Sequence, residues 1–317
     1  MTTSFKTATV LCALGMSLAA SDSSDLPGRG STRHETAHEQ AVSLETVLGR
    51  AAAYVEDYRR ILGGVIAKEA YLQEYSDSSR RTLSDLLLFS SPELSQPWLA
   101  FLDVLSVDGV PVADREARLR DLLRETPEVS AERWERLVAE SARFNIGPIF
   151  RNVNAPTMAL QFLTSGDQPR SSFDAAGEDP VEGTTAWMVD FQERTGPALI
   201  RGREGRELFA HGRVWIEPET GRVMQTDLRT IDQTLIPLGA QGAVPAELST
   251  RVVVVYADDQ GLGISVPTRM TEIYRLDEVL PSRSAGLHRK IEIHGEAVYS
   301  NYRRFEVDVS FTVAETP

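Results

Sequence analysis

The sequence predicts an α+β protein in which a curved antiparallel sheet, an open half-barrel, wraps around an amphipathic helix and carries a short helical insertion. Three observations lead to this prediction. A helix with a continuous apolar stripe begins at residue 43, and strand-like segments make up most of the remaining chain. No linker or internal repeat divides residues 43–317, which favours a single domain. A sheet of about eight to ten antiparallel strands tends to curl or close.

The composition is that of a globular chain with an acidic surface. Of the 317 residues, 42% are hydrophobic and 25% charged, and 46 acidic against 33 basic side chains leave a net charge of −13. Such a surface repels phosphate backbones, so we do not expect a nucleic acid partner. No apolar run reaches the roughly 18 residues of a membrane-spanning helix, so we do not expect an integral membrane protein.

Residues 1–20 have the composition of a bacterial signal peptide. Lys6 supplies a positive charge, an apolar stretch runs from Ala8 to Ala20, and Ser17-Leu18-Ala19 offers the small residues that a signal peptidase requires. The stretch is too short to span a bilayer. We therefore predict an exported protein of the periplasm or cell envelope, in preference to a cytosolic protein with an apolar start.

Cys12, the only cysteine, lies inside this predicted leader. The large residues Val10 and Leu11 precede it, where a lipid-modified cysteine needs small ones, so we do not favour lipidation. Without the leader no thiol remains, which excludes disulfides and thiolate chemistry. Residues 21–42 are rich in Ser, Gly, Asp and His and poor in large apolar side chains, and we expect them to form a disordered linker.

The first folded element is an amphipathic helix. Ser43 is a suitable N-cap, and apolar residues recur at the helical period until Leu62, where Gly63-Gly64 breaks the pattern. Residues 65–75 and 82–89 then have the composition of two extended segments, separated by a polar run.

A hairpin and a helical interval come next. Asp108-Gly109, between extended segments 98–107 and 110–112, is a strong signal for a two-residue hairpin turn. Residues 114–164 form the helical interval, in which Asn145 to Pro148 supplies a glycine stop and a proline. Within it we expect three helices, over residues 114–125, 130–144 and 157–163.

From Ser171 onward the pattern predicts only strands. Residues 305–313 alternate apolar and polar side chains most regularly, as in a half-buried antiparallel strand. Residues 252–257 are β-branched and apolar on both faces, which indicates a buried central strand. Further strands are expected around residues 187–191, 214–216, 223–230, 264–274 and 290–294, with a turn at Pro218 to Gly221.

His34-Glu35-Thr36-Ala37-His38 matches the H-E-x-x-H pattern of zinc peptidases. That chemistry needs both histidines on one rigid helix, with Glu35 as general base. The flanking residues carry no apolar stripe to dock such a helix, and the match lies in the predicted linker. A zinc hydrolase using His34, Glu35 and His38 therefore remains an alternative that we do not favour, and we expect no metal and no cofactor.

The remaining charged groups indicate a solvent-facing sheet surface. His211, His288 and His294 lack the spacing of metal ligands, so surface or turn positions are expected. Arginines interspersed with acids, at Arg201, Arg203, Arg206 and Arg213, are typical of cross-strand charge pairs. A phosphate or carboxylate site among them is the less favoured reading.

Two segments resemble bacterial exported proteins related to the periplasmic lipoprotein carriers (LolA/LolB-like). The run Arg213-Val-Trp-Ile-Glu-Pro-Glu-Thr-Gly-Arg-Val-Met-Gln-Thr-Asp-Leu228 is similar to a hairpin of that family, and Tyr299 to Phe305 to a strand near its C-terminus. The resemblance implies an open half-barrel that holds helices and an apolar groove. This chain departs from the family in its interval 114–164 and in its greater length. Fold transfers better than function.

The leading hypothesis is a non-enzymatic protein that binds a lipid, an acyl chain or a lipidated partner in an apolar groove of the sheet. The alternative from another class is a surface or scaffold protein that binds other proteins, since core-facing and groove-facing residues look alike in a sequence. The candidate groove residues are Trp187, Val189, Phe191, Val214, Ile216, Met224 and Leu228.

Overall fold

The computed structural model describes residues 42–89, 99–117, 136, 139–149, 151, 155–202, 205–237, 243–280 and 287–304. All of them belong to one compact unit, Val42–Pro317, which is separate from residues 1–41. Four predicted features therefore lie outside the described residues: the leader 1–20, the linker 21–42 before Val42, the His34–His38 pattern and the strand 305–313.

Helix α1 (Leu44–Leu62) confirms the predicted amphipathic helix. Ser43 caps it, because its hydroxyl accepts a hydrogen bond from the amide of Thr46 at 3.2 Å. The helix ends at Gly63, as the glycine pair predicts. Its buried stripe consists of Val47, Ala51, Ala52, Val55, Tyr58 and Leu62.

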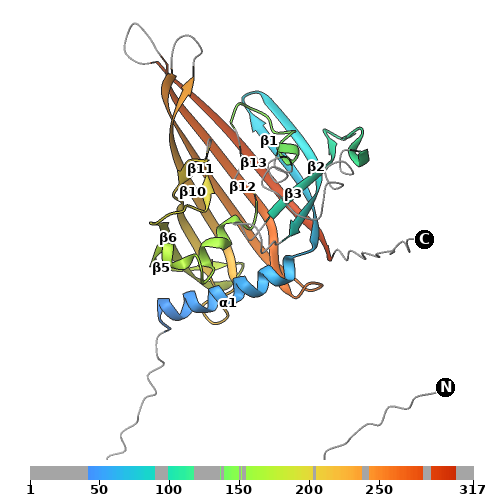
Figure 1. Cartoon of the computed structure of the whole chain (residues 1–317). Helices are drawn as coiled ribbons and strands as arrows, with labels where there is room; N and C mark the ends of the chain where they lie inside the picture. Colours follow the sequence, from blue (N-terminus) through green and yellow to red (C-terminus); the bar gives the residue numbers. More distant parts are fainter. Residues whose placement is uncertain are drawn as a thin grey trace, which may run out of the picture. The chain divides into compact units, whose positions relative to one another are not determined.

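The main sheet is antiparallel throughout and has eleven strands, in the order β4-β3-β2-β1-β13-β12-β11-β10-β9-β6-β5 (Figure 1). The two end strands do not pair with each other in this order, so the curved sheet is open, which confirms the predicted half-barrel. The strands are β1 (Val65–Tyr75), β2 (Ser78–Phe89), β3 (Leu99–Val107), β4 (Val110–Pro111), β5 (Ser171–Val181), β6 (Thr184–Glu193), β9 (His211–Ile216), β10 (Val223–Pro237), β11 (Ala243–Asp259), β12 (Ile264–Leu280) and β13 (Leu287–Arg304). A separate small sheet pairs β7 (Ile200–Arg201) with β8 (Glu207–Leu208).

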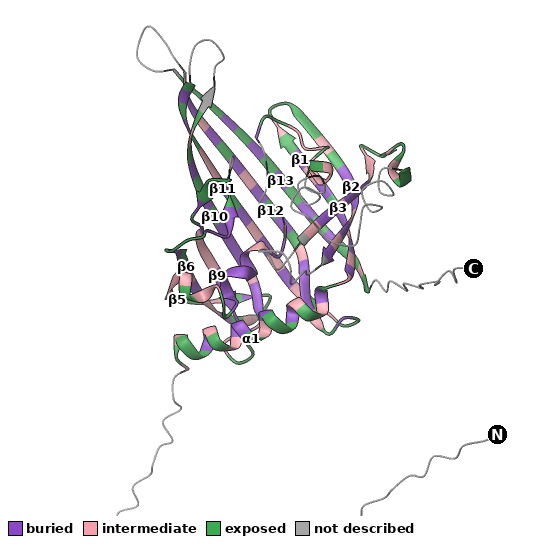
Figure 2. Ribbon diagram, in the orientation of Figure 1, coloured by how far each residue is buried: buried purple, intermediate pink, exposed green. Residues whose placement is uncertain are grey.

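The two faces of the sheet differ in what covers them. Residues on one face pack with α1 in the main hydrophobic cluster, and we call this the inner face. The opposite face of the sheet is the outer face. Buried and more exposed residues alternate along the long strands, as expected for strands with one covered face (Figure 2). On the central strand β11, Val252, Val254 and Tyr256 are buried on the inner face, while Val253 and Val255 are only half-buried. The prediction of a central strand is confirmed, but burial on both faces is not.

The hairpin prediction is also confirmed. Asp108 and Gly109 both have positive φ, 51° and 80°, as a type I′ turn between β3 and β4 requires. In the hairpin between β1 and β2 the turn is tighter than predicted, because β2 begins at Ser78 rather than at Thr82. Polar side chains at positions 78–81 hid this extension, since they lie on an exposed strand end.

The described residues confirm one predicted helix of the interval. The segment predicted as the third helix, residues 157–163, forms the 3-10 helix η1 (Met158–Leu163). At the predicted start of the first helix, Asp114 has φ of 57°, a left-handed conformation rather than a right-handed helical one. Gly147 has φ of 82°, in agreement with the predicted glycine stop. Most of the residues of the first two predicted helices lie outside the part that the structure describes.

Candidate functional site

Six of the seven candidate groove residues lie together on the inner face. Cross-strand pairing places Val189 beside Val214 and Trp187 beside Ile216, with Phe191 and Leu228 in the same hydrophobic cluster. All six belong to that cluster, Trp187 as a half-buried member and the other five with at most 3% of their surface exposed.

Met224 is the exception, and it lies on the outer face. The register between β10 and β9 shifts between Val223 and Gln225, which marks a bulge and turns Met224 away from its neighbours. Met224 packs instead in a second cluster with Val181, Ala186 and Trp215. A strand bulge leaves no mark in an alternating pattern, so the sequence could not separate Met224 from the other six.

Helix α1 and η1 cover this apolar inner face. The rings of Phe162 on η1 and Phe191 on β6 are 4.9 Å apart, and Leu160 and Leu163 are fully buried. The side-chain amide of Gln168 donates hydrogen bonds to the carbonyl oxygens of Leu48 on α1 (2.9 Å) and Leu163 on η1 (2.8 Å). A ligand could therefore reach the six residues only if α1 or η1 moves.

The turn between β9 and β10 holds α1 in place. Arg50 donates a hydrogen bond to the carbonyl oxygen of Pro218 at 2.6 Å. Gly221 has φ of 77° and lies so close to α1 that a Cβ atom there would overlap the carbonyl group of Arg50. This close approach confirms the predicted turn and gives its glycine a second role, in helix packing.

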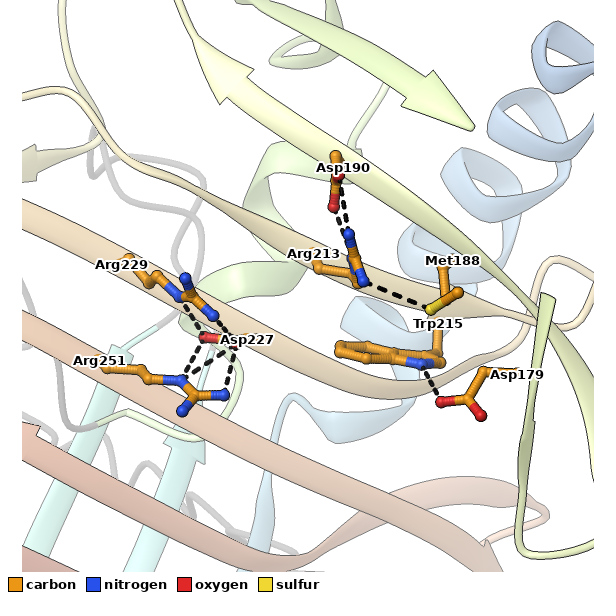
Figure 3. Close-up of polar contacts among 8 residues, drawn as sticks. All are labelled: Asp179, Met188, Asp190, Arg213, Trp215, Asp227, Arg229 and Arg251. Atoms are coloured by element: carbon orange, nitrogen blue, oxygen red, sulfur yellow. Dashed lines mark hydrogen bonds and ion pairs between the residues drawn. The ribbon is translucent and has the colours of Figure 1, made fainter. Parts of the chain in front are cut away.

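The outer face carries several charge pairs, of which the one at Arg213 is a predicted cross-strand pair (Figure 3). Arg213 on β9 pairs with Asp190 on β6, through its Nε at 2.6 Å and its Nη2 at 2.9 Å. Arg229 and Arg251 both bind Asp227, which is only 3% exposed. Burial raises the pKa of Asp227, but hydrogen bonds from the two guanidinium groups outweigh it and hold the pKa below its ordinary value.

This outer-face group is best explained as a structural element. Trp215 donates a hydrogen bond to Asp179 at 3.2 Å, and the Arg213 guanidinium lies 6.0 Å from its ring centre (Figure 3). The three arginines are matched by the three acids of the group, Asp179, Asp190 and Asp227, so they leave no surplus of positive charge for a phosphate or carboxylate. Arg213 instead lies over the apolar cluster around Trp215, where it also contacts the sulfur of Met188.

A buried polar cluster on the inner face was missed by the sequence analysis. The hydroxyl of Tyr71 donates to Glu272 at 2.5 Å, and the hydroxyl of Tyr274 donates to the other oxygen of the same carboxylate at 3.4 Å. Arg151 donates to the Tyr71 hydroxyl at 3.0 Å and is 2% exposed. Gln73 links this group to the loop before Arg151, since its side-chain oxygen accepts from the amide of Ile146 at 3.1 Å.

Glu69 lies at the edge of the same cluster and is 2% exposed. Its cross-strand neighbours are Tyr299 on β13 and Ser84 on β2. Burial, opposed by a hydrogen bond with Tyr299 and reinforced by the nearby Glu272, raises the pKa of Glu69 to about 8. Burial likewise raises the pKa of Glu272, opposed by Tyr71 and Arg151. The sequence did carry a signal for the burial of Glu69, because alternation in β1 places it on the same face as the apolar residues Val65 and Ala67.

A surface depression of about 680 Å³ lies where β10 and β12 end and β11 and β13 begin. Leu235, 64% exposed, lies on its wall, and Arg206 lies at its edge, where it donates to the carbonyl oxygen of Gln233 at 2.8 Å. The lining residues are Arg206, Gln233, Thr234, Leu235, Pro245, Ala246, Glu247, Asp277, Val279 and His288.

Neither the histidines nor the acids of the described chain form a metal centre. His288 pairs with Asp277 at 2.8 Å and His294 with Glu292 at 2.5 Å, both at the surface as expected. His211 is half-buried on β9, and burial lowers its pKa. Among the residues that the structure describes, no group of three or more His, Cys, Asp or Glu side chains could hold a metal ion. Within the same ranges, no helix is long and apolar enough to cross a membrane.

No protein-family model matches the chain, and no curated protein matches its sequence. Among solved structures, it is similar to a domain described as an outer membrane lipoprotein-sorting protein domain from Vibrio parahaemolyticus, at 12% identity and a TM-score of 0.34, over 80% of this chain and 93% of that one. A DUF1329 family protein from Desulfovibrio piger has 11% identity and a TM-score of 0.33, over 83% and 95%. MucB in its complex with MucA from Pseudomonas aeruginosa has 8% identity and a TM-score of 0.20, over 81% and 99%. By its name the first is of the carrier class that the sequence resembles, but at these identities and TM-scores no function is transferred.

Proposed function

We propose that this chain is a non-enzymatic, exported protein of the cell envelope that binds a lipid, an acyl chain or a lipidated partner on the inner face of its sheet. The observation that supports the proposal is the covering of that face. It is apolar over many strands, yet α1 and the short η1 cover it rather than a second sheet. A helix can move aside without breaking any strand pairing.

The energetics of such binding are sufficient. Burying a methylene group stabilises a complex by about 0.8 kcal/mol, so an acyl chain of about 15 carbons contributes on the order of 10 kcal/mol before ordering costs. Part of that energy is used to separate α1 from the sheet, including its hydrogen bonds to Pro218 and Gln168. The ligand would replace the apolar side of α1 against Val214 and Ile216.

The test compares two isoleucines on opposite faces of one sheet. Ile216 is fully buried on the inner face, and Ile231 is 50% exposed on the outer face. We expect Ile216→Ala to weaken retention of a palmitoyl probe while far-UV circular dichroism stays native-like, and Ile231→Ala to leave retention unchanged. If folded Ile216→Ala retains the probe as well as wild type, or if folded wild-type protein retains no probe, the inner face is only a core.

Protein binding is a second candidate, supported by the outer face of β10. Ile231 and Leu235 are both strongly exposed there, and Leu235 lines the 680 Å³ depression. The two side chains lie four residues apart on the same face of the strand, and exposed apolar surface of this kind is found at protein-binding sites. Native mass spectrometry of protein expressed with residues 1–20 and purified from the exported fraction separates the two candidates. A co-purified lipid adduct supports the carrier, and a processed chain without an adduct favours the protein-binding surface.

A further inference from the structure

The buried carboxyl group of Glu69 has no cation beside it, within the described residues, to balance a negative charge. It is 2% exposed, and one of its oxygens, Oε1, has no hydrogen-bond partner among the residues that the structure describes. The nearest positive group in the cluster, Arg151, donates instead to Tyr71 and Gln73. An ionised carboxylate buried without a cation is costly, so such a group remains protonated in the folded protein.

The groups around Glu69 agree with this assignment. Tyr299 on β13 lies within hydrogen-bonding reach of the carboxyl, and this contact alone would lower the pKa of Glu69, but burial outweighs it. The other titratable groups that face Glu69 are Glu272 on β12 and Tyr302 on β13, and neither carries a positive charge.

Glu69 is also placed where a charge would disturb several strands. It lies on β1, paired with β2 through Ser84 and with β13 through Tyr299. Ser84, 1% exposed, also has a hydroxyl without a partner in the described part of the chain. Loss of the Glu69 proton would place a second carboxylate beside Glu272, where Arg151 balances only one.

We propose that Glu69 is a proton-operated switch in the centre of the sheet, which holds the inner face closed while protonated and loosens β1, β12 and β13 when it loses its proton. The switch responds to alkaline conditions, because a buried acid without a cation releases its proton only above neutral pH. It differs from the proposed binding function, since it requires no ligand.

The test is the pH dependence of the thermal midpoint and of 8-anilinonaphthalene-1-sulfonate fluorescence, for wild type and Glu69→Gln of the full chain. Wild type should lose thermal stability as the pH rises from 5 to about 8, because the unfolded chain gives up this proton at lower pH than the folded one, and it should bind more dye at pH 9. Glu69→Gln should match wild type at pH 5 and lose less stability as the pH rises, since an amide keeps the size and cannot ionise. Glu74→Gln, an exposed glutamate on the same strand, should follow wild type.

Infrared spectroscopy gives a second measurement that does not depend on stability. The carbonyl band of a protonated carboxyl should be present in wild type at pH 6.5 and absent from Glu69→Gln. Two results would overturn the proposal: an unchanged band in Glu69→Gln, or a Glu69→Gln protein as sensitive to pH as wild type. A stability deficit of Glu69→Gln relative to wild type that grows from pH 5 to pH 9 would also overturn it, because the ionised form would then be the native one.

Discussion

Gly295 is the residue that allows the buried carboxylate cluster to form. It is paired with Gln73 on β1 and with Glu272 on β12, and the Tyr71 side chain reaches Glu272 across it. A Cβ atom at position 295 would lie 2.5 Å from the Tyr71 hydroxyl and 2.7 Å from a Glu272 oxygen. Both distances are shorter than real Cβ atoms show, so any side chain there must displace the pair.

We expect Gly295→Ala to destabilise the fold by about 1–3 kcal/mol, the usual cost of overpacking a core. The measurement is urea unfolding, with Gly49→Ala as the control, because a Cβ at position 49 of α1 meets nothing within 4 Å. In a double-mutant cycle, Tyr71→Phe should relieve part of the Gly295→Ala loss by removing the clashing hydroxyl. A neutral Gly295→Ala would contradict this account of the cluster.

At the scale of the element, the attachment of α1 depends on the turn between β9 and β10. Gly221→Ala combines a strained positive φ with a clash against the backbone of Arg50. Gly263→Ala is the matched control, since Gly263 has φ of 70° and open space around it. We expect Gly263→Ala to cost about 1 kcal/mol from backbone strain alone, and Gly221→Ala to cost about 1–3 kcal/mol more, measured by urea unfolding. Equal losses would mean that the contact between the turn and α1 contributes nothing.

The elements that the sequence predicted well are those with local signals. The Ser43 cap, the glycines after Leu62 and the Asp108-Gly109 turn act through their own backbone conformation, so their effect can be read without the rest of the chain. The bulge beside Met224 depends on a neighbouring strand that no local pattern encodes, and the placement of Met224 on the face of the other six residues was wrong. The helix over residues 157–163 was predicted, but its 3-10 form was not.

For the whole molecule, the sequence predicted an apolar face wrapped around the first helix, but not whether that face is filled or open. Val214, Ile216 and their neighbours have the same letters in a filled core and in an open groove, and only the positions of α1 and η1 distinguish the two. The polar cluster was missed for a related reason. Glu69 and Glu272 are distant in the chain, and their encounter is a consequence of the strand order β1-β13-β12.

The same strand order implies that the described part of the chain unfolds as one unit. The main hydrophobic cluster runs from β1 and β2, through α1 and η1, to β6 and β9, and the second cluster around Trp215 is small and lies on strands β5, β6, β9 and β10. We therefore expect one calorimetric transition whose calorimetric and van't Hoff enthalpies agree. Beyond Arg229, β10 no longer pairs with β9, and the ends of β10 to β13 continue without it. A separate transition would arise first in this region. Such a transition at lower temperature, shifted by Leu235→Asp but not by Ile216→Val, would show that this end is held by its own contacts rather than by the shared core.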